Sequence, residues 1–550
     1  MAVRKIHSTL GPEPVILPIP DRRAIPWIFM MVYSVFLLWT LPDFAVTWDE
    51  PGWFDYGRDQ WEWILGASEE PALSDPSNYF HYGSLPSLTA AATHWLFHER
   101  LNLLDSDSAH HISNVGWGLV LVACLIVWAN RTLGWQGACL AVLLWAFWIR
   151  LWADVHNNIN DLPGAAAALW AGWAAWRVAV SPKKRLADYL LWGFLMGIAY
   201  STRAPNVYFL AFWILLWAVT DRWVLGRRWG GWTLWGAAAA FLIFMLTVKA
   251  ANPFLWNRSV FDQVINVNPA FYMSRSVGEQ PLWFAGNFYL DGEVPRYYAF
   301  WIFAISTPPL TLLLLGLAMG SVVRGRRSVP PHLTLWLFLA VGALAKHLTG
   351  MGNYDGIRHF MEGFGPLTLM ASHGALLVAN ARMRLSLLRR RSLDVLLAAS
   401  VILPLLTAVR IYPYLTGYFN PLAGSLNDAW THYEADYWGQ GLKPAVRWLR
   451  SSVDLSARQI YVPEAFELTR GLLPESGNIA RLHEKEQLLA APAGSLLVIL
   501  NRQGPLRRAY HRSWFELMKG SLDGCPPGWQ LYHREGPHPS LPPAVSICIK

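Results

Sequence analysis

The chain has 550 residues, of which 54% are hydrophobic and only 15% are charged, and its formal net charge is +8. A soluble domain is typically about 25% charged, so this composition excludes an ordinary soluble protein and predicts a polytopic membrane protein. The basic residues are concentrated in short loops, which is the pattern that sets membrane topology, so the positive charge does not indicate a nucleic-acid partner. We expect no cleavable signal peptide, because the first apolar run lacks a small-residue cleavage site.

The apolar runs predict about eleven membrane-spanning helices, each near the roughly 20 residues that a bilayer requires. In chain order their approximate ranges are Pro26–Leu41, Ile112–Ala129, Gly134–Leu151, Leu162–Val180, Tyr189–Tyr200, Asn206–Thr220, Trp232–Val248, Tyr298–Val322, Leu333–Leu348, Phe364–Ala379 and Leu393–Arg410.

The loops between these helices fix the expected orientation. Lys and Arg fall on one side, which is therefore predicted to be cytoplasmic: residues 1–25 before the first helix, Lys183-Lys184-Arg185, Arg222 with Arg227 and Arg228, Arg324 with Arg326 and Arg327, and the run from Arg382 to Arg391. The opposite side receives Asp43–His111, Trp152–Asp161, Ala251–Tyr297, Thr349–Gly363 and the tail after Arg410. In a bacterium, that side of the inner membrane is the periplasm; in a eukaryote, it is the lumen of the endoplasmic reticulum.

The chain divides into a transmembrane domain over residues 26–438 and a small soluble α/β domain over 439–550. In the first outer loop, Leu85, Leu88, Ala92, Trp95 and Leu96 recur at helical spacing and predict an amphipathic helix in the membrane interface. The tail contains short apolar runs typical of strands: Gln459–Val462, Leu496–Leu500 and Val545–Ile549. Cys525 and Cys548 lie in this tail and form a disulfide if it occupies an oxidising compartment; otherwise they stay free.

Asp49 and Glu50 are adjacent carboxylates that directly follow the first apolar helix. Charged side chains so close to hydrocarbon tend to be functional. A positioned carboxylate can accept the proton of a hydroxyl group as that hydroxyl attacks a sugar carbon. The alternative is a pair of solvated carboxylates at a helix end.

Further motifs follow in a fixed order, and together with the acidic pair they carry a resemblance. They are His81-Tyr82-Gly83-Ser84-Leu85-Pro86; Asp154 with Asn160-Asp161-Leu162-Pro163; Ser201-Thr202-Arg203; Val294-Pro295-Arg296-Tyr297-Tyr298 with Ser306-Thr307-Pro308; Asn353-Tyr354-Asp355-Gly356-Ile357-Arg358-His359; and Ala435-Asp436-Tyr437-Trp438-Gly439. The set, over roughly Trp48 to Trp448, resembles the protein O-mannosyltransferases and their bacterial relatives, the aminoarabinose lipid A transferases. The chain departs from the family pattern at His81, where a His-Pro-Pro motif is not intact, and at Arg296, which replaces a Trp.

The resemblance implies the GT-C fold of membrane glycosyltransferases, here an α-helical polytopic protein with a small C-terminal α/β domain. It implies a polyprenyl-phosphate-sugar donor, a membrane-lipid environment and an acceptor that is a protein, lipid or glycan. It also implies that Asp49 is the catalytic base and that Glu50 supports it. His81, Asp161, Tyr297 and Asp355 then support the substrate or the loops.

Cations at the outer ends of the helices fit a phosphate-bearing donor, because a guanidinium can grip phosphate with two hydrogen bonds. Arg203, Arg296, Arg358 and His359 are the predicted phosphate-binding residues, and Asp355 beside Arg358 either orients it or forms a simple ion pair. The alternative for each cation is a side chain that extends to lipid headgroups, and for Lys249 we favour that alternative.

Asp154, His156 and Asp161 form a third polar cluster. Asp154 is expected either to assist the base or to hold a divalent cation with His156, whereas a hydrophilic turn with Asp161 as helix cap is the structural alternative. The spacing is not diagnostic of a metal, so no cofactor is assigned. Two other classes stay open: a lipid-linked-sugar flippase or transporter, and a polymerase or ligase of envelope glycans.

Overall fold

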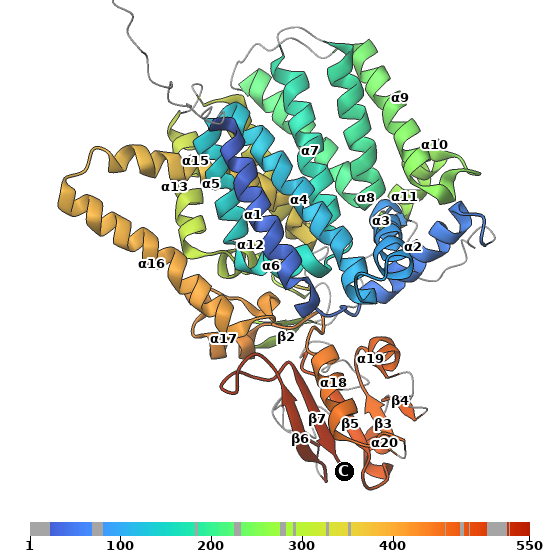
Figure 1. Cartoon of the computed structure of the whole chain (residues 1–550). Coiled ribbons are helices and arrows are strands. Elements are labelled where there is room, and N and C mark those ends of the chain that lie inside the picture. Colours follow the sequence, from blue (N-terminus) through green and yellow to red (C-terminus); the bar gives the residue numbers. More distant parts are fainter. Residues whose placement is uncertain are drawn as a thin grey trace, which may run out of the picture.

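The computed structural model consists of a large helical bundle with a small sheet domain at one end, where the C-terminus lies (Figure 1). The structure describes residues 22–68, 81–181, 185–224, 233–274, 282–289, 293–325, 329–349, 354–456, 458–473, 478–482, 485–502, 525–526 and 528–550. Of the predicted basic residues, Lys183, Lys184, Arg227, Arg228, Arg326 and Arg327 lie outside these ranges.

Within the described ranges, five helices are long and apolar enough to cross a membrane, or seven if each of two bent helix pairs is one span. The five are α1 with its flanking turns (Arg22–Asp43), α4 (Ser106–Thr132), α8 with the following π-helical turn (Leu186–Arg222), α9 (Leu234–Ala251) and α16 (Leu387–Ile411). Three further helices pack inside the bundle: α7 (Asp161–Val180), α14 (Pro331–Ala345) and α15 (Phe364–Arg382). The fold is therefore that of a mostly helical, multi-pass membrane protein, as predicted; the count of eleven spans stays a prediction.

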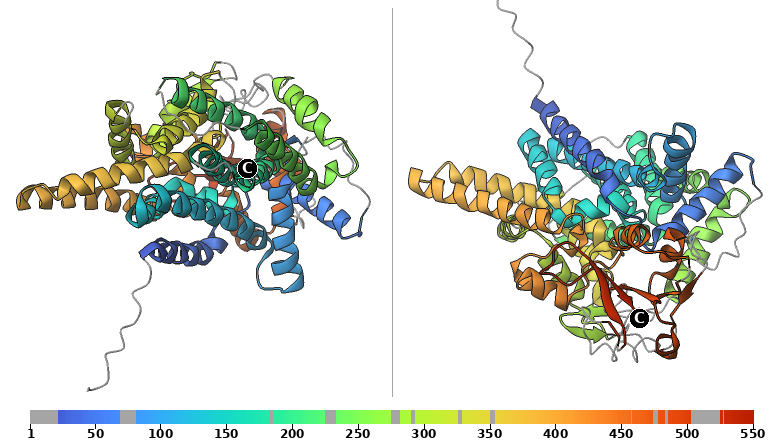
Figure 2. Two further views of the ribbon diagram at one scale, coloured as in Figure 1. Left: turned by 90° about the horizontal axis from the view of Figure 1, so that it is seen from above. Right: turned by 60° about the horizontal axis from the view of Figure 1, so that its bottom comes forward.

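Lipid-facing surface is most evident on α16, which projects sideways from the bundle in both views of Figure 2. Most of its large apolar side chains are exposed, including Leu388 and Val409 at 77% each. A helix with so much exposed apolar surface is stable in hydrocarbon but not in water.

Helix α8 reverses direction at Arg203. The backbone there is not helical (φ −156°, ψ 85°), and Pro205 follows two residues later. Pro lacks an amide hydrogen and clashes with the preceding turn, so it favours a break. The amide of Ala204 instead donates to the carbonyl of Tyr82, at 2.8 Å.

Contacts place both ends of α8 at the same end of the bundle: Asp188 with Arg177 (2.6 Å), Trp217 with Thr334 (3.0 Å) and Trp176 with His332 (ring centroids 6.5 Å apart). A straight helix of 34 residues would be about 50 Å long, far beyond the roughly 30 Å of hydrocarbon. The two halves of α8 therefore correspond to the two predicted helices, Tyr189–Tyr200 and Asn206–Thr220, which meet at Arg203.

Two predicted single helices are each divided in the structure. Gly134–Leu151 is replaced by α5 (Gly134–Ala146) and α6 (Ile149–Asn157), which meet at 77°, so much of the predicted outer loop Trp152–Asp161 is helical. Tyr298–Val322 is replaced by α12 (Tyr298–Ser306) and α13 (Pro309–Gly325), which meet at 120°. Pro308 and Pro309 explain this second break, because both lack the amide hydrogen that a continuous helix needs.

Shorter elements cover the end of the bundle that faces the sheet domain. Besides 3₁₀ turns, they are α2 (Glu50–Ile64), α3 (Leu85–His94) with a π-helical extension (Trp95–Arg100), α10 (Val260–Asp262), α11 (Asn268–Ser274), the hairpin β1 (Leu282–Phe284) and β2 (Asn287–Tyr289), and α17 (Leu426–His432). Helix α3 confirms the helix predicted from the apolar spacing after Leu85. Helix α2, whose residues include Asp55, Arg58 and Asp59, was not predicted.

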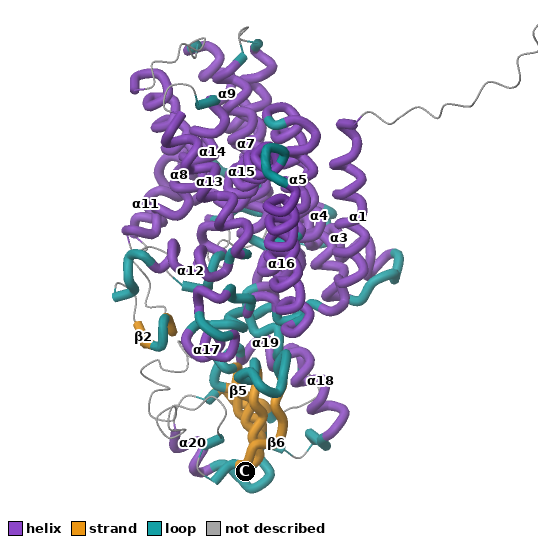
Figure 3. Tube along the Cα trace, turned by 90° about the vertical axis from the view of Figure 1, so that its left-hand side faces the viewer, coloured by secondary structure: helices purple, strands orange, loops and turns teal. Residues whose placement is uncertain are grey.

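The tail forms a five-stranded mixed sheet in the order β4-β3-β5-β7-β6, visible in orange in Figure 3. Its elements are α18 (Leu442–Ser452), β3 (Ile460–Val462), α19 (Phe466–Leu472), β4 (Ile479–Arg481), α20 (Lys485–Ala490), β5 (Leu496–Leu500), β6 (Gln530–Glu535) and β7 (Val545–Ile549). The alternation along β5 sends Leu496 and Val498 toward α18 and Leu497 and Ile499 toward the other face. The three predicted strands and the α/β character of the tail are confirmed.

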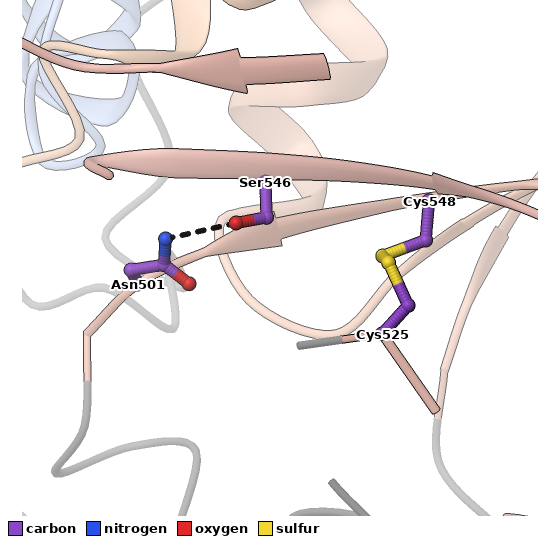
Figure 4. The surroundings of a disulfide bond; sticks show 4 residues. All are labelled: Asn501, Cys525, Ser546 and Cys548. Carbon is purple, nitrogen blue, oxygen red and sulfur yellow. Dashed lines mark hydrogen bonds between the residues drawn. A yellow bond between two sulfur atoms is a disulfide. The ribbon is translucent and has the colours of Figure 1, made fainter. Parts of the chain in front are cut away.

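Cys525 and Cys548 form a disulfide, which ties β7 to the segment before β6 (Figure 4). Of the two outcomes left open by the sequence, the structure therefore has the bonded one. Cys124 and Cys139 are buried and free, as expected of core thiols.

Candidate active site

A cavity of about 200 Å³ lies at the end of the bundle where α2, α7 and the break in α8 meet. It is lined by Thr47, Asp49, Glu50, Trp53, Tyr82, Asn157, Asn158, Ile159, Asn160, Asp161, Arg203, Tyr354, Arg358, His359 and Trp438. These residues come from six separate stretches of the chain, so only the tertiary fold brings them together.

The two adjacent carboxylates point in different directions. Asp49 precedes α2, its side chain is 36% exposed, and it forms an ion pair with Arg358. Glu50 is fully buried: its Oε2 accepts from the amide of Thr47 at 2.6 Å, and its Oε1 lies 3.0 Å from His111 Nε2. Burial raises the pKa of Glu50, although His111 acts in the opposite direction. Asp49 is thus available to a substrate, whereas Glu50 braces the loop.

Arg203 reaches the cavity because α8 breaks at this residue. Its side chain forms an ion pair with Asp161, the first residue of α7. Gly164, one turn further along α7, leaves room for it, since a Cβ there would lie 2.7 Å from Arg203 Cβ. The Asp161–Arg203 pair is therefore built by close packing of α7 against the α8 break.

The loop from His81 to Ser84 is docked against this break. Gly83 has φ +116°, and a Cβ at this position would lie 2.4 Å from the carbonyl oxygen of Ser201, so only glycine fits. His81 is buried, its Nδ1 lies 2.8 Å from Asn268 Oδ1, and its ring stacks on Phe271. His81 thus anchors the loop, and its neighbour Tyr82 lines the cavity.

Arg358 and His359 follow a tight turn in which Asp355 has φ +53°. Arg358 Nη2 lies 2.5 Å from Asp355 Oδ2, while its Nη1 pairs with Asp49. His359 Nδ1 lies 3.5 Å from Arg203 Nη2. Burial, followed by the charges of Arg358 and Arg203, lowers the pKa of His359 well below its usual value, so the ring is neutral at pH 7. His359 is therefore a hydrogen-bonding group here and not a cation.

Two nitrogen atoms of this group are buried without a hydrogen-bond partner in the described structure: Arg358 Nε and His359 Nε2. Buried polar atoms are almost always satisfied, and such exceptions often mark a ligand site. If Nδ1 of His359 accepts from Arg203, its Nε2 carries the hydrogen and is a donor. Arg358 and His359 then both offer a free N–H beside the cavity.

Five predicted site residues do not line the cavity: His81 and Asp355, which contact its surrounding loops as described above, and Asp154, Arg296 and Tyr297. Asp154 is fully buried on α6, where its Oδ1 accepts from Asn158 at 3.0 Å. Arg296 and Tyr297 are exposed, Tyr297 at 57%. Their direct roles in catalysis, phosphate binding and substrate support stay sequence-based predictions. In the described part of the chain, no three His, Cys, Asp or Glu side chains gather to hold a metal ion.

Several lining residues were not singled out from the sequence. Tyr82, Tyr354 and Trp438 stand inside motifs that had been recognised, so the motifs themselves were the signal. Asn157 and Asn158 had no such signal in the sequence, because polar residues between two apolar runs are typical of an ordinary turn. Arg502, which contacts Asp355 from the sheet domain, lies two residues after the predicted strand Leu496–Leu500, and the end of a strand is a common place for functional residues.

A second, larger cavity of about 590 Å³ lies on the other side of α2. Its lining combines aromatic rings, carboxylates and histidines, including Phe54, Trp61, Glu62, Trp95 and His110. It also includes Leu468 and Leu472 of α19, so this cavity, unlike the small one, has part of its wall in the sheet domain. Helix α2 thus forms a wall between the two cavities.

The fold defines the class of protein, a multi-pass helical membrane protein with a C-terminal α/β domain. No family model matches the chain, and no curated protein matches it. Its structural neighbours include two structures of ArnT from Cupriavidus metallidurans, one in the apo state and one bound to undecaprenyl phosphate. Each is 12% identical in sequence to this chain and superposes with a TM-score of 0.48. Each match covers 96% of this chain and 98% of the ArnT chain. Another is the archaeal oligosaccharyltransferase AglB from Archaeoglobus fulgidus, in complex with an inhibitory peptide and a dolichol-phosphate, with 10% identity and a TM-score of 0.47 over 82% of this chain and 64% of that one.

Proposed function

We propose that this protein is a membrane glycosyltransferase of the GT-C superfamily that transfers a sugar from a polyprenyl-phosphate carrier to an acceptor. The single observation that carries the proposal is the convergence of Arg203, Arg358 and His359 on one cavity at the end of an apolar bundle, with two buried N–H groups unsatisfied. A lipid phosphate is the ligand that fits, since its tail lies in the bilayer while its headgroup needs donors at the end of the helices.

The two arginines are neutralised before the donor binds, Arg358 by Asp49 and Asp355 and Arg203 by Asp161. A phosphate that binds Arg358 therefore competes with Asp49 for the guanidinium. The competition has a useful consequence, because a carboxylate released from its arginine is free to accept a proton. Donor binding would thus prepare Asp49 as the general base.

The reaction follows from this arrangement. The acceptor hydroxyl oxygen forms a bond to the donor's anomeric carbon as Asp49 takes the hydroxyl proton. The bond between that carbon and the phosphate oxygen breaks, and the polyprenyl phosphate leaves with the electron pair. Arg358, Arg203 and His359 stabilise the charge that develops on the leaving phosphate. A divalent cation at this site is left as an open proposal.

The larger cavity behind α2 has room for the acceptor. Two of its lining residues, Val46 and Pro51, flank Asp49 in the sequence. Aromatic rings and carboxylates suit the apolar faces and hydroxyl groups of a sugar or a lipid-linked glycan, and also suit a peptide. The acceptor is accordingly proposed as a protein, lipid or glycan.

We place the protein in the bacterial inner membrane with both cavities and the sheet domain in the periplasm. Three helices start near the small cavity and carry basic residues near their other ends, at the far side of the bundle. These residues are Arg177 of α7, Arg222 after the second half of α8, and Arg382 of α15.

Ser452, at the end of α18, is exposed. The variant Ser452→Cys should react with a membrane-impermeant maleimide on intact spheroplasts; the four native cysteines give little background, because two are buried and two are bonded. Labelling only after lysis would reverse the orientation.

The decisive assay measures sugar release from radiolabelled polyprenyl-phosphate sugars by membranes that contain the protein and its native acceptors. We expect transfer of label to a product other than the carrier lipid, with loss of label from the carrier. A flippase would instead move the donor across the bilayer of proteoliposomes and leave the sugar on its carrier. A polymerase or ligase would use carriers that bear an oligosaccharide in preference to a single sugar.

A further inference from the structure

Arg502 is a buried arginine of the sheet domain that reaches the ion pairs of the small cavity. It is 3% exposed and follows β5 by two residues. The residue before it, Asn501, is fixed to β7: its amide nitrogen Nδ2 donates to Pro543 O at 2.8 Å and to Ser546 Oγ at 3.2 Å (Figure 4). The end of β5 is therefore a rigid base for Arg502.

The Arg502 side chain contacts three groups outside the sheet. It forms an ion pair with Asp355, its Nε lies 3.5 Å from Glu434 Oε2, and its guanidinium lies 4.4 Å from the centre of the Trp48 ring. Trp48 is the neighbour of Asp49, and Asp355 is the partner of Arg358. Arg502 thus touches both chain segments that carry the Asp49–Arg358 pair.

The division of the Asp355 oxygens gives this contact a specific consequence. Oδ1 is bound by Arg502, and Oδ2 by Arg358. If Arg502 were absent, both oxygens would be open to Arg358, and a two-point arginine–carboxylate pair is the stronger geometry. Arg358 would then turn toward Asp355 and away from Asp49 and the cavity.

We propose that Arg502 is a positioning residue: by occupying one oxygen of Asp355, it holds Arg358 in the orientation that faces the cavity. The sheet domain is then a working part of the site and not a separate appendage. The effect on donor binding rests on the proposed function, whereas the coupling between Arg502 and Asp355 does not.

The test is a double-mutant cycle in the full-length, detergent-solubilised protein, with the dissociation constant for undecaprenyl phosphate as the readout. Arg502→Ala is expected to weaken binding about tenfold, within the usual range for coupled charged groups. Asp355→Asn should also weaken binding, and the double variant should bind no worse than Asp355→Asn alone, because the effect passes through Asp355. If Arg502→Ala does not fold, Arg502→Lys, which keeps the charge but loses the fork, replaces it in the cycle.

The matched control is Arg458→Ala, which removes another arginine of the sheet domain whose hydrogen bond, to the carbonyl of Gly494 at 2.8 Å, stays inside that domain. Its binding should equal that of the wild type. Wild-type affinity in Arg502→Ala, or additive effects in the double variant, would overturn the inference. If the wild-type protein itself fails to bind undecaprenyl phosphate, the proposed function falls, and the same cycle on the midpoint of thermal unfolding decides the inference: non-additive shifts support it and additive shifts reject it.

Discussion

Replacement of Asp49 by Asn is expected to slow sugar transfer about a hundredfold or more, because the loss of a general base typically costs about 10²–10⁴ in rate. Asn keeps the shape of the side chain, and its carbonyl can still accept a hydrogen bond from Arg358, so the loop before α2 should stay in place. Asp49 is the carboxylate that is both partly exposed and in the cavity. The measurement is the single-turnover rate of label transfer from the donor, in membranes with equal amounts of folded protein.

Two further variants make this result specific. Asp59→Asn removes an exposed carboxylate of the same helix that lines neither cavity, and it should transfer sugar at the wild-type rate. Asp161→Asn tests the rival base, because Asp161 is the other aspartate of the small cavity. Near-normal transfer in Asp49→Asn together with an inactive Asp161→Asn would move the base to the start of α7.

Loss of the guanidinium at Arg358 or Arg203 is expected to weaken binding of a polyprenyl phosphate about tenfold or more, because a charged hydrogen bond is worth about 1.5–3 kcal/mol. Arg358→Lys is the safer variant, since Arg358→Ala would leave Asp49 without a partner and the buried Asp355 with Arg502 alone, and the loss of a charge partner from a buried carboxylate is destabilising. Equilibrium binding of undecaprenyl phosphate to the purified protein measures the effect directly.

Arg382→Ala is the control for this pair, because it also breaks an arginine–carboxylate contact, with Asp394 at 2.6 Å, but at the opposite end of the bundle. Its affinity should be unchanged. Unaltered affinity in both the Arg203 and the Arg358 variants would show that this cavity does not bind the phosphate. Weaker binding in only one variant would show that this arginine alone binds it.

Individual elements differ in how well the sequence predicted them. Hydropathy located the apolar helices, because a helix that crosses a bilayer must be apolar along its length, and short apolar runs located the strands around Ile460, Leu496 and Val545. The break at Arg203 falls in the gap between the two predicted helices Tyr189–Tyr200 and Asn206–Thr220, and Pro205 favours that break. The bend within Gly134–Leu151 was missed because an apolar run without proline carries no local mark of a change of direction, whereas the bend within Tyr298–Val322 was missed although Pro308 and Pro309 mark it in the sequence.

The sequence by itself determined that this is a helical membrane protein. It also identified Asp49, Asp161, Arg203 and Arg358 as candidate site residues, because a charge next to an apolar helix is costly wherever the helix is placed. Only the tertiary structure decided how these residues pair, Asp49 with Arg358 and Asp161 with Arg203, and that Glu50 is held by the buried His111. It also left Arg296 at the surface and brought Arg502, 147 residues away in sequence, onto Asp355. The physical reason is that ion pairs and buried donors depend on distances of a few ångströms between separate segments, and no local pattern in the chain encodes those distances.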